Sequence, residues 1–173
     1  MNKLIKFLSA VLCVIATSTA NAQPNLKLEV ALPSLQVAEY HKPYVAIWLE
    51  DSKRQVTQIA VWYDVEMKNA KGEEWLADLR QWWRRAGRNL SLPIDGVTGA
   101  SKGPGMHTVS TDLTDLLAKM PAGKYKIRIE AVREVGGREL VNIPLTLPLD
   151  TTKLPLSVEG RSELGLIRLS AKQ

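Results

Sequence analysis

Residues 122–147 read AGKYKIRIEAVREVGGRELVNIPLTL and predict a β-hairpin. In the first half, apolar side chains alternate with charged ones, which is the period of a strand with one buried face. The apolar face would be formed by Tyr125, Ile127, Ile129 and Ala131. Gly136-Gly137 supplies the turn, and Pro144 in the returning half is typical of an edge strand or a bulge. This stretch therefore predicts an antiparallel sheet.

Other stretches of the chain carry strand patterns as well. Residues 26–32 alternate in the same way, while 44–50 and 56–63 flank a polar turn at 51–54, as expected of a second hairpin. The tail from 155 to 169 could add one or two more strands. Several short strands joined by turns are typical of a sandwich or a small barrel. We expect a mainly β fold, an immunoglobulin-like β-sandwich of about seven strands with one inserted helix.

The inserted helix is predicted at residues 73–86 (EEWLADLRQWWRRA), where the period changes from strand to helix. The residues at helical spacing are Trp75, Leu76, Leu79, Trp82, Trp83 and Ala86. Acidic residues stand in the first turn and arginines in the last, which suits the helix dipole, and Gly87 can end the helix. Two interpretations follow: the tryptophans pack on one end of the sandwich as core, or they form an exposed aromatic platform for a flat ligand.

The N-terminal residues have the pattern of a secretory signal. Two lysines precede a ten-residue apolar run, and Ala20-Asn21-Ala22 is a typical cleavage site. The run is too short for a stop-transfer helix, and Cys13 lies within it rather than after it, which argues against a lipid anchor. We therefore expect a signal peptide at 1–22, a single domain at 23–173 and a periplasmic location. An uncleaved N-terminal membrane anchor is the alternative.

Composition excludes several classes of protein. The 173 residues include one cysteine and two histidines, too few for a zinc site of four cysteines, for one of two cysteines and two histidines, or for a disulfide framework. Without residues 1–22 the chain has no cysteine, and its formal net charge falls from +5 to +3 because Lys3 and Lys6 are removed. This weak positive charge comes without a dense Lys/Arg run, so no nucleic-acid partner is expected. Outside the N-terminal run, no segment is apolar enough to span a membrane.

A long connector at residues 89–105 separates the predicted helix from the next strand. It contains four glycines and two prolines, which predicts irregular backbone, and long loops are often functional. Its small residues would leave the Ser101 hydroxyl open to a large partner. The arginines before it could meet a phosphate or an acidic partner, or could form a solvated helix face: Arg80, Arg84, Arg85 and Arg88.

Residues 95–101 (DGVTGAS) resemble the D-x-x-[ST]-G-A-[ST] motif to which periplasmic flavin transferases attach FMN. Such motifs occur in the flavin-bearing subunits of sodium-pumping NADH:quinone reductase and of Rnf complexes. The resemblance implies that the Ser101 hydroxyl takes FMN through a phosphoester, and that Asp95 presents the site to the transferase and its metal. It also implies a pliable recognition stretch, formed by Thr98, Gly99 and Ala100.

A wider resemblance covers nearly all of the chain after residue 22. It rests on YVAIWLED at 44–51, WLADLRQWWR at 75–84, the connector from 95 to 105 and PAGKY at 121–125. These stretches resemble a family of uncharacterised bacterial periplasmic proteins, a domain of unknown function similar to the immunoglobulin-like domain of flagellar hook-capping proteins. The family's genes often lie near flavin transferases and PepSY-type membrane reductases, which implies redox or iron-uptake work outside the cytosol.

No conventional catalytic site is visible in the sequence. His41 and His107 have the contexts of turn or surface residues, and Ser110 and Asp112 near His107 show no triad order. The scattered carboxylates lack the spacing of a calcium loop: Glu50, Asp51, Asp64 and Glu66. A flavin carrier needs little catalytic equipment. We therefore rank first an electron carrier with covalent FMN, second an unmodified binding or scaffold module that docks to a membrane reductase or an iron-uptake system, and third a haem- or iron-binding accessory.

Overall fold

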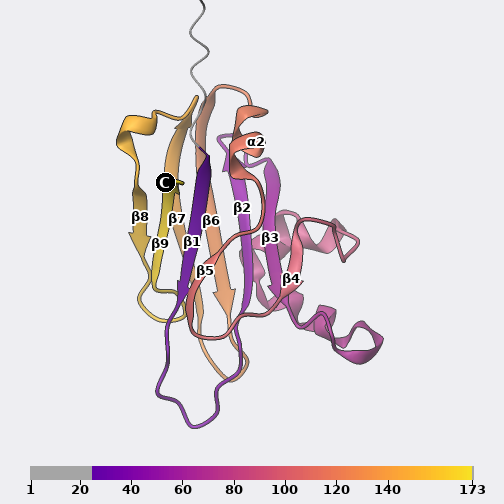
Figure 1. Ribbon diagram of the computed structural model, residues 1–173. Coiled ribbons are helices and arrows are strands. Elements are labelled where there is room, and N and C mark those ends of the chain that lie inside the picture. The colour runs from indigo at the N-terminus through magenta and orange to yellow at the C-terminus, as the bar shows by residue number, and fades with distance from the viewer. Residues whose placement is uncertain (1–24, 173) are drawn as a thin grey trace, which may run out of the picture.

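Two β-sheets lie face to face in the computed structural model of the protein, which describes residues 25–172 (Figure 1). The four-stranded sheet has the order β5 (Gly105–Thr108), β1 (Leu26–Leu32), β9 (Leu166–Ala171) and β8 (Leu156–Glu159). The five-stranded sheet has the order β4 (Thr98–Ala100), β3 (Val56–Tyr63), β2 (Tyr44–Asp51), β6 (Gly123–Val132) and β7 (Arg138–Leu147). The predicted mainly β sandwich is confirmed. The signal peptide expected at 1–22 lies outside the described residues.

The described residues form nine strands, where about seven were expected from the usual count of such sandwiches. The two additional strands are β4 and β5, with three and four residues. Strands of this length are too short to show an alternating pattern in the sequence. All neighbouring strands pair antiparallel except β3 and β4, which run parallel.

The hairpin predicted over 122–147 forms β6 and β7. Its pairs run from Gly123 opposite Leu147 to Val132 opposite Arg138 without a shift in register. β7 is the outer strand of its sheet, so Pro144, which has no N–H to donate, lies at an edge as expected. The second predicted hairpin forms β2 and β3, with a bulge in its pairing.

The core between the sheets is built from the inward faces of both hairpins and of β1 and β9. Its most deeply buried members include Leu28, Ile47, Leu49, Ile127, Ile129, Ile143 and Leu169. A second helix, α2 (Leu113–Ala118), adds Leu113 and Leu117 to this core, and Asp112 caps it by accepting a 3.1 Å hydrogen bond from the N–H of Asp115. The sequence did not predict α2, because six residues are too few for a helical period to stand out.

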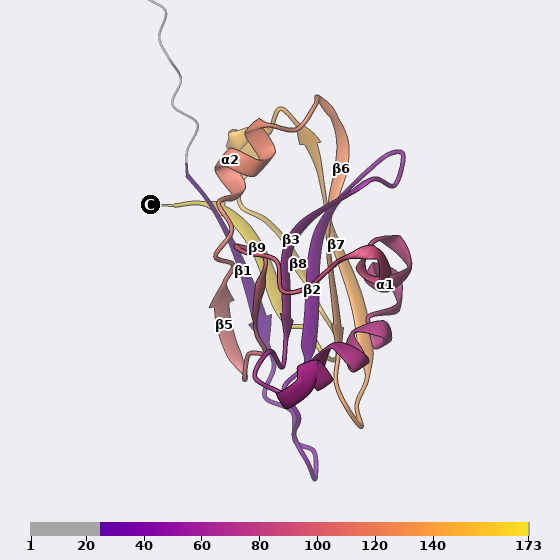
Figure 2. The same cartoon turned by 90° about the vertical axis from the view of Figure 1, so that its right-hand side faces the viewer.

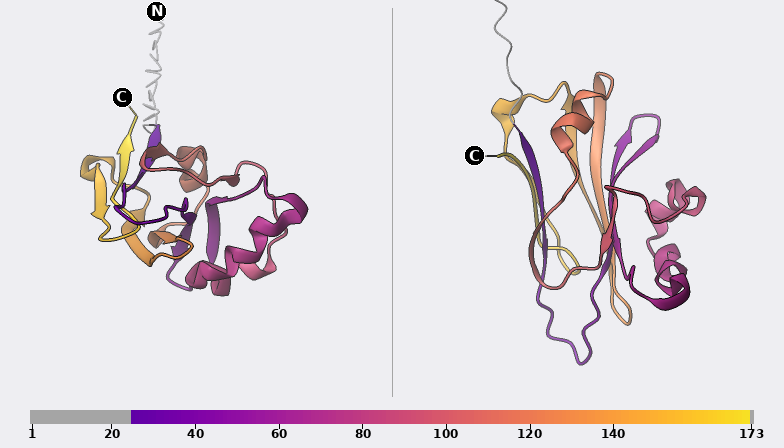
Figure 3. Two further views of the ribbon diagram at one scale, coloured as in Figure 1. Left: turned by 90° about the horizontal axis from the view of Figure 1, so that it is seen from below. Right: turned by 45° about the vertical axis from the view of Figure 1, so that its right-hand side comes forward.

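The insert between β3 and β4 differs from the single helix predicted at 73–86. It consists of a 3₁₀ helix η1 (Lys68–Asp78), the helix α1 (Arg80–Arg85) and a short 3₁₀ helix η2 (Gly87–Asn89). The chain bends at Leu79, whose ψ of 67° is not helical. Figures 2 and 3 show the insert lying over the outer face of the five-stranded sheet. The expectation that it packs on one end of the sandwich was therefore wrong.

The outer face of the five-stranded sheet is apolar, which explains where the insert packs. β2 and β3 present four buried residues on the side away from the main core: Ala46, Trp48, Val61 and Tyr63. The insert covers them with Leu76, Leu79 and Trp82, which are buried as well. We call this set of seven residues the outer-face cluster. Because of it, β2 is buried on both faces, and its apolar residues do not alternate with polar ones.

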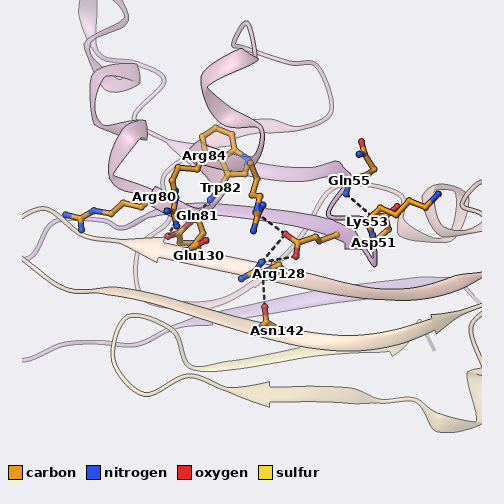
Figure 4. A network of polar contacts seen from close by, with 12 residues as sticks. Asp51, Lys53, Gln55, Arg80, Gln81, Trp82, Arg84, Arg128, Glu130 and Asn142 are labelled. Atoms are coloured by element: carbon orange, nitrogen blue, oxygen red, sulfur yellow. Dashed lines mark hydrogen bonds and ion pairs between the residues drawn. The ribbon is translucent and has the colours of Figure 1, made fainter.

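A buried glutamate on β6 holds the insert on the sheet (Figure 4). Glu130 is fully buried, and its carboxylate accepts hydrogen bonds from the N–H of Gln81 at 3.0 Å, the N–H of Trp82 at 2.8 Å and Nη1 of Arg138 at 3.0 Å. The two backbone groups are unpaired donors at the start of α1, where Leu79 offers no side-chain cap. Glu130 therefore acts as a helix cap supplied by the neighbouring sheet.

Another carboxylate, that of Glu139 on β7, holds the turn between β8 and β9. It accepts hydrogen bonds of 2.6–3.0 Å from the N–H groups of four consecutive residues, Arg161, Ser162, Glu163 and Leu164. Burial raises the pKa of the Glu139 carboxyl, but the hydrogen bonds, led by that from Leu164, outweigh burial and leave the pKa below its ordinary value. The ionised carboxylate therefore ties the two sheets together at this turn.

We expect Glu139→Gln to destabilise the protein more at neutral pH than in acid. A carboxyl whose pKa is lower in the folded chain stabilises the fold above its unfolded pKa, near 4.5, and loses that contribution as the pH falls through the folded pKa. Urea unfolding of both proteins at about pH 7 and about pH 3 measures the effect. The difference in the free energy of unfolding should shrink in acid. A difference of equal size at both pH values would contradict the role of the ionised form.

Candidate functional site

The acceptor segment predicted at 95–101 begins with a tight turn. The hydroxyl of Thr98 accepts a 2.8 Å hydrogen bond from the N–H of Ile94, and the N–H of Thr98 donates to the Ile94 carbonyl, also at 2.8 Å. Gly96 has a φ of 70°, a conformation that favours glycine, and Asp95 beside it is exposed. The Asp95 carboxylate is therefore exposed to solvent, whereas the Thr98 hydroxyl is used in a hydrogen bond within the turn.

The end of this segment is an edge strand, although irregular backbone was expected throughout 89–105. β4 runs parallel to β3, with the N–H of Val61 donating to the Val97 carbonyl and the N–H of Ser101 donating to the Tyr63 carbonyl, each at 2.9 Å. Strand pairing therefore fixes the backbone on both sides of Thr98–Ala100. The pattern of small residues concealed this strand, because three residues without a large apolar side chain carry no strand signal.

Gly99 and Ala100 occupy different environments on β4. A Cβ atom at Gly99 would lie 3.2 Å from Cδ1 of Trp62, so glycine lets the strand approach β3 closely. Ala100 is exposed. Because the hydrogen-bonding groups of a strand alternate in direction, the N–H and C=O of Ala100 point away from β3. β4 is the last strand of its sheet, and the outward N–H of Thr98 is already bonded to the Ile94 carbonyl.

The residues after Ser101 are held while the chain crosses from one sheet to the other. Lys102 Nζ lies 5.9 Å from the ring centre of Trp62, and His107 Nε2 lies 2.7 Å from the carbonyl oxygen of Gly103. The His107 ring also meets Trp62 edge to face, with ring centres 6.1 Å apart. His107 is therefore a structural residue of the connector, and Ser101 stands between two anchored stretches of backbone.

Ser101 lines a groove of about 780 Å³ between β4, the insert and the turn that joins β6 to β7. This volume lies within the usual range of small-molecule sites, about 300–1,000 Å³. Its aromatic lining comes from Tyr40, Tyr44 and Trp75. Its charged lining is balanced, with Lys42, Arg80, Arg133 and Arg138 against Asp64, Glu66, Asp78 and Glu134. Such a lining suits a flat, weakly charged group better than a polyanion.

Of the three tryptophans in the insert, Trp75 is the one that lines this groove. It is 49% exposed, whereas Trp82 is fully buried and Trp83 is partly buried against the outer-face cluster. The Nε1 of Trp82 also donates to Gln58 Oε1 at 2.8 Å. Trp82 is therefore core, although on the outer face of the sheet and not at one end of the sandwich, and Trp75 is half exposed.

The arginines of the insert do not gather beside Ser101. Arg80 lines the groove, but Arg85 turns to the sheet, where its Nε lies 3.8 Å from Glu50 Oε2. The remaining two are exposed and are not part of the groove lining: Arg84 and Arg88. The four arginines named from the sequence therefore do not form one phosphate site.

Sequence reasoning missed a buried arginine of the groove. Arg133 forms a bidentate pair with Glu163, from Nε at 2.9 Å and from Nη2 at 3.2 Å, and both side chains are buried. Its Nη1 is buried too and has no hydrogen-bond partner within residues 25–172. A Cβ atom at Gly136 would lie 2.5 Å from the Arg133 Cζ, so the glycine turn is what lets the backbone cover this guanidinium. In the sequence, the only local sign of this part of the site was the turn predicted at Gly136-Gly137.

Tyr40 and His41, also missed as site residues, form another part of the groove wall. Burial raises the pKa of the Tyr40 phenol above its ordinary value. The ring nitrogens of His41 lie 3.2 Å from Glu39 and 3.4 Å from Glu134. These contacts tie the 39–41 segment to the β6–β7 turn.

Neither a metal cluster nor a membrane-crossing helix occurs within residues 25–172. No three His, Cys, Asp or Glu side chains in that range come together in a way that could hold a metal ion. Asp51, one of the carboxylates considered for a cation, instead accepts hydrogen bonds from the N–H groups of Lys53 and Gln55 at 2.8 and 2.7 Å. In the described part of the chain, every helix is too short or too polar to cross a membrane.

A family model matches most of the chain, over residues 25–166, and is described as "Predicted periplasmic protein (DUF2271)". Comparison with curated proteins and with solved structures gave no match. The family description agrees with the periplasmic location expected from the N-terminal pattern, and it confirms the expected membership of an uncharacterised periplasmic family. The chain belongs to DUF2271, a family of predicted periplasmic proteins.

Proposed function

We propose that this protein is an exported electron carrier with FMN attached covalently to Ser101. One observation carries the proposal: the residue that matches the acceptor of the flavinylation motif follows an edge strand directly and lines a groove with a half-exposed tryptophan. When bound, FMN supplies the redox chemistry. The chain has to hold the flavin, limit its contact with solvent and present it to a donor and an acceptor such as a membrane-bound reductase.

The residues around Ser101 fit a flavin in size and in chemistry. The groove, at about 780 Å³, is large enough for a cofactor-sized group. Aromatic side chains such as Trp75 and Tyr40 can stack on fused rings. The buried Nη1 of Arg133 is a donor that still needs an acceptor, and the carbonyl oxygens of a flavin ring are acceptors.

Attachment requires a flavin transferase as partner. In this step the bond between Ser101 Oγ and phosphorus forms while the P–O bond to the nucleotide leaving group of a flavin dinucleotide donor breaks. The hydroxyl proton passes to a base of the transferase, and no electrons are exchanged. The role of this chain is to position the acceptor. The N–H of Ser101 donates to the Tyr63 carbonyl, while the Ser101 hydroxyl takes no part in the strand pairing. Asp95, exposed in the preceding turn, is within the same short segment and is open to the transferase and its metal.

Ser101→Ala is expected to abolish flavin attachment, because alanine has no oxygen to form the phosphoester. Coexpression of the full chain with a periplasmic flavin transferase should give a band that fluoresces after denaturing electrophoresis, since a covalent flavin survives denaturation. Ser101→Ala should be dark. Ser91→Ala, which removes an exposed serine of the same connector, should fluoresce like the wild type. Asp95→Ala should reduce the fluorescence without lowering the melting temperature.

One outcome would overturn the proposal: the transferase modifies a control protein while the wild-type chain stays dark. That result would favour the second function, an unmodified binding or scaffold module that docks to a membrane reductase or an iron-uptake system. The exposed arginines of the insert, Arg84 and Arg88, favour this alternative, because exposed guanidinium groups suit an acidic partner.

A further inference from the structure

We infer that the groove beside Ser101 is the seat of the flavin ring, with Trp75 stacked on the face of the ring and Arg133 Nη1 donating to one of its carbonyl oxygens. The inference rests on the proposed function, because it describes where the group attached to Ser101 lies. Two features of the groove support it, and neither depends on the sequence motif.

The first feature is the exposure of Trp75. This residue is 49% exposed, while three of the four other tryptophans are buried and the last is partly buried: Trp48, Trp62, Trp82 and Trp83. Two further exposed apolar residues line the same groove, Met67 and Val135. An apolar patch on the wall of a groove is typical of a binding surface. The groove therefore offers a flat aromatic face with apolar neighbours.

The turn that carries Val135 adds to this feature. Val135 has a φ of 51°, in the left-handed region that β-branched residues rarely adopt. It is also 85% exposed, so no packing of its own side chain explains the conformation. Strained residues of this kind persist where the surrounding structure holds them, often beside ligands. Here the strain accompanies the close approach of Gly136 to the Arg133 guanidinium.

The second feature is the unpaired donor of Arg133. Glu163 binds two of its nitrogens, Nε and Nη2, and leaves Nη1 buried without a partner within residues 25–172. Buried donors are nearly always paired, because leaving one unpaired loses a hydrogen bond that water would have made. Because Nη1 has almost no accessible surface, an acceptor oxygen on a ligand would complete the set only after a small shift of the groove wall. A ligand with an apolar face could therefore stack on Trp75, and an acceptor atom at its edge could bind Arg133.

A flavin ring has both of these properties, and it can reach the groove from Ser101. Ala100 and Ser101 are themselves part of the lining, so a group attached to the Ser101 hydroxyl enters the groove without crossing the protein. The charges of the lining balance, which suits a ring that carries no net charge before it accepts electrons. Trp82 and Trp83 do not line the groove, so Trp75 is the one tryptophan of the insert that could serve as the aromatic platform for a flat ligand.

The test uses the full chain loaded with FMN by coexpression with the transferase, with loading measured by intact mass. Flavin emission and its quenching by iodide are then compared in the wild type and in Trp75→Ala, Trp75→Phe and Trp83→Phe. A stacked indole quenches flavin emission and shields the ring, so Trp75→Ala should raise the emission several-fold. It should also raise the iodide quenching constant, because the indole no longer shields one face of the ring. Trp75→Phe should lie between the wild type and Trp75→Ala, and Trp83→Phe should match the wild type.

Arg133→Lys tests the second contact, because lysine keeps a cation opposite Glu163 and removes Nη1. It should raise the iodide quenching constant while the chain stays folded by circular dichroism. If both proteins carry the full FMN mass and Trp75→Ala has the same flavin emission and iodide quenching as the wild type, the flavin ring does not lie in this groove. The proposed function would not be affected by that result. Full FMN mass with a response to Trp75→Ala but none to Arg133→Lys would overturn the role of Arg133. A wild-type chain without FMN mass would overturn the proposed function itself.

Discussion

Trp82→Ala is expected to lower the free energy of unfolding by about 3–5 kcal/mol, the range for truncating a buried aromatic residue. Trp82 is fully buried in the outer-face cluster. Gly87 closes over its ring so tightly that a Cβ atom there would lie 2.5 Å from Cζ3 of the indole, so the cavity left by truncation has little room to collapse. The variant would also leave Gln58 without the Nε1 donor that it now accepts from.

Trp75→Ala is the matched control for this prediction, since it removes the same side chain from the same insert. Because Trp75 is half exposed, the loss should stay below about 1 kcal/mol. Urea unfolding followed by far-ultraviolet circular dichroism measures both variants, and the slope of the free energy against urea should be unchanged. Losses of equal size in the two variants would mean that the outer face is not packed as described.

Glu130→Ala is expected to cost about 1–3 kcal/mol, the range for leaving a buried hydrogen-bond donor unpaired. The substitution removes the acceptor shared by two N–H groups of α1 and by Arg138. Arg138 can turn to solvent, because its side chain is 37% exposed, but the N–H of Trp82 is buried and would stay unpaired. We therefore expect the insert to detach before the sandwich unfolds, with loss of protection of the α1 amides in hydrogen exchange.

Glu134→Ala provides the comparison for Glu130→Ala. Glu134 lies four residues further along, in the turn after β6, but it is exposed, so its removal should change the free energy of unfolding by less than about 0.5 kcal/mol. Glu130→Gln, which keeps one acceptor oxygen, should lie between the two. If Glu130→Ala melts like Glu134→Ala, the carboxylate does not hold the insert.

The sequence predicted the hairpins well because the information for them is local. In β6, alternation of apolar and charged residues identified Ile127 and Ile129 as core, and both are fully buried. In the insert, the helical spacing grouped Leu76, Leu79 and Trp82, which are buried together, but it placed the half-exposed Trp75 with them. It also did not distinguish a 3₁₀ helix from an α-helix. Over two turns the two periods bring nearly the same residues to one side.

The break at Leu79 and the position of the insert depend on contacts that no local pattern contains. The cap of α1 is Glu130, which follows Gln81 by 49 residues in the chain. From the sequence, Glu130 was one more charged residue on the polar face of a strand. The expected packing on one end of the sandwich failed for the same reason, since it required knowing that β2 and β3 stand side by side with apolar outer faces.

In the candidate site, too, the part that is local in the chain could be predicted and the part built from distant segments could not. The segment that we predict as the flavin acceptor could be named from the sequence because its seven residues are contiguous, and in the structure Ser101 directly follows the edge strand β4. The groove was not visible, because it is assembled from segments that lie far apart in the chain, around Tyr40, Trp75, Ser101 and Arg133. None of these other segments carries a pattern that marks a ligand site by itself.

The intact mass of the chain from the periplasm of a host that coexpresses a flavin transferase tests the central claim most directly. The predicted result is the mass of the chain from Gln23 onward plus one FMN group bound as a phosphoester. Peptide mapping should then locate the whole increment on the peptide that contains Ser101. The unmodified mass, obtained with a transferase that modifies a control protein in the same host, would contradict the account. An FMN group found on any residue other than Ser101 would contradict it as well.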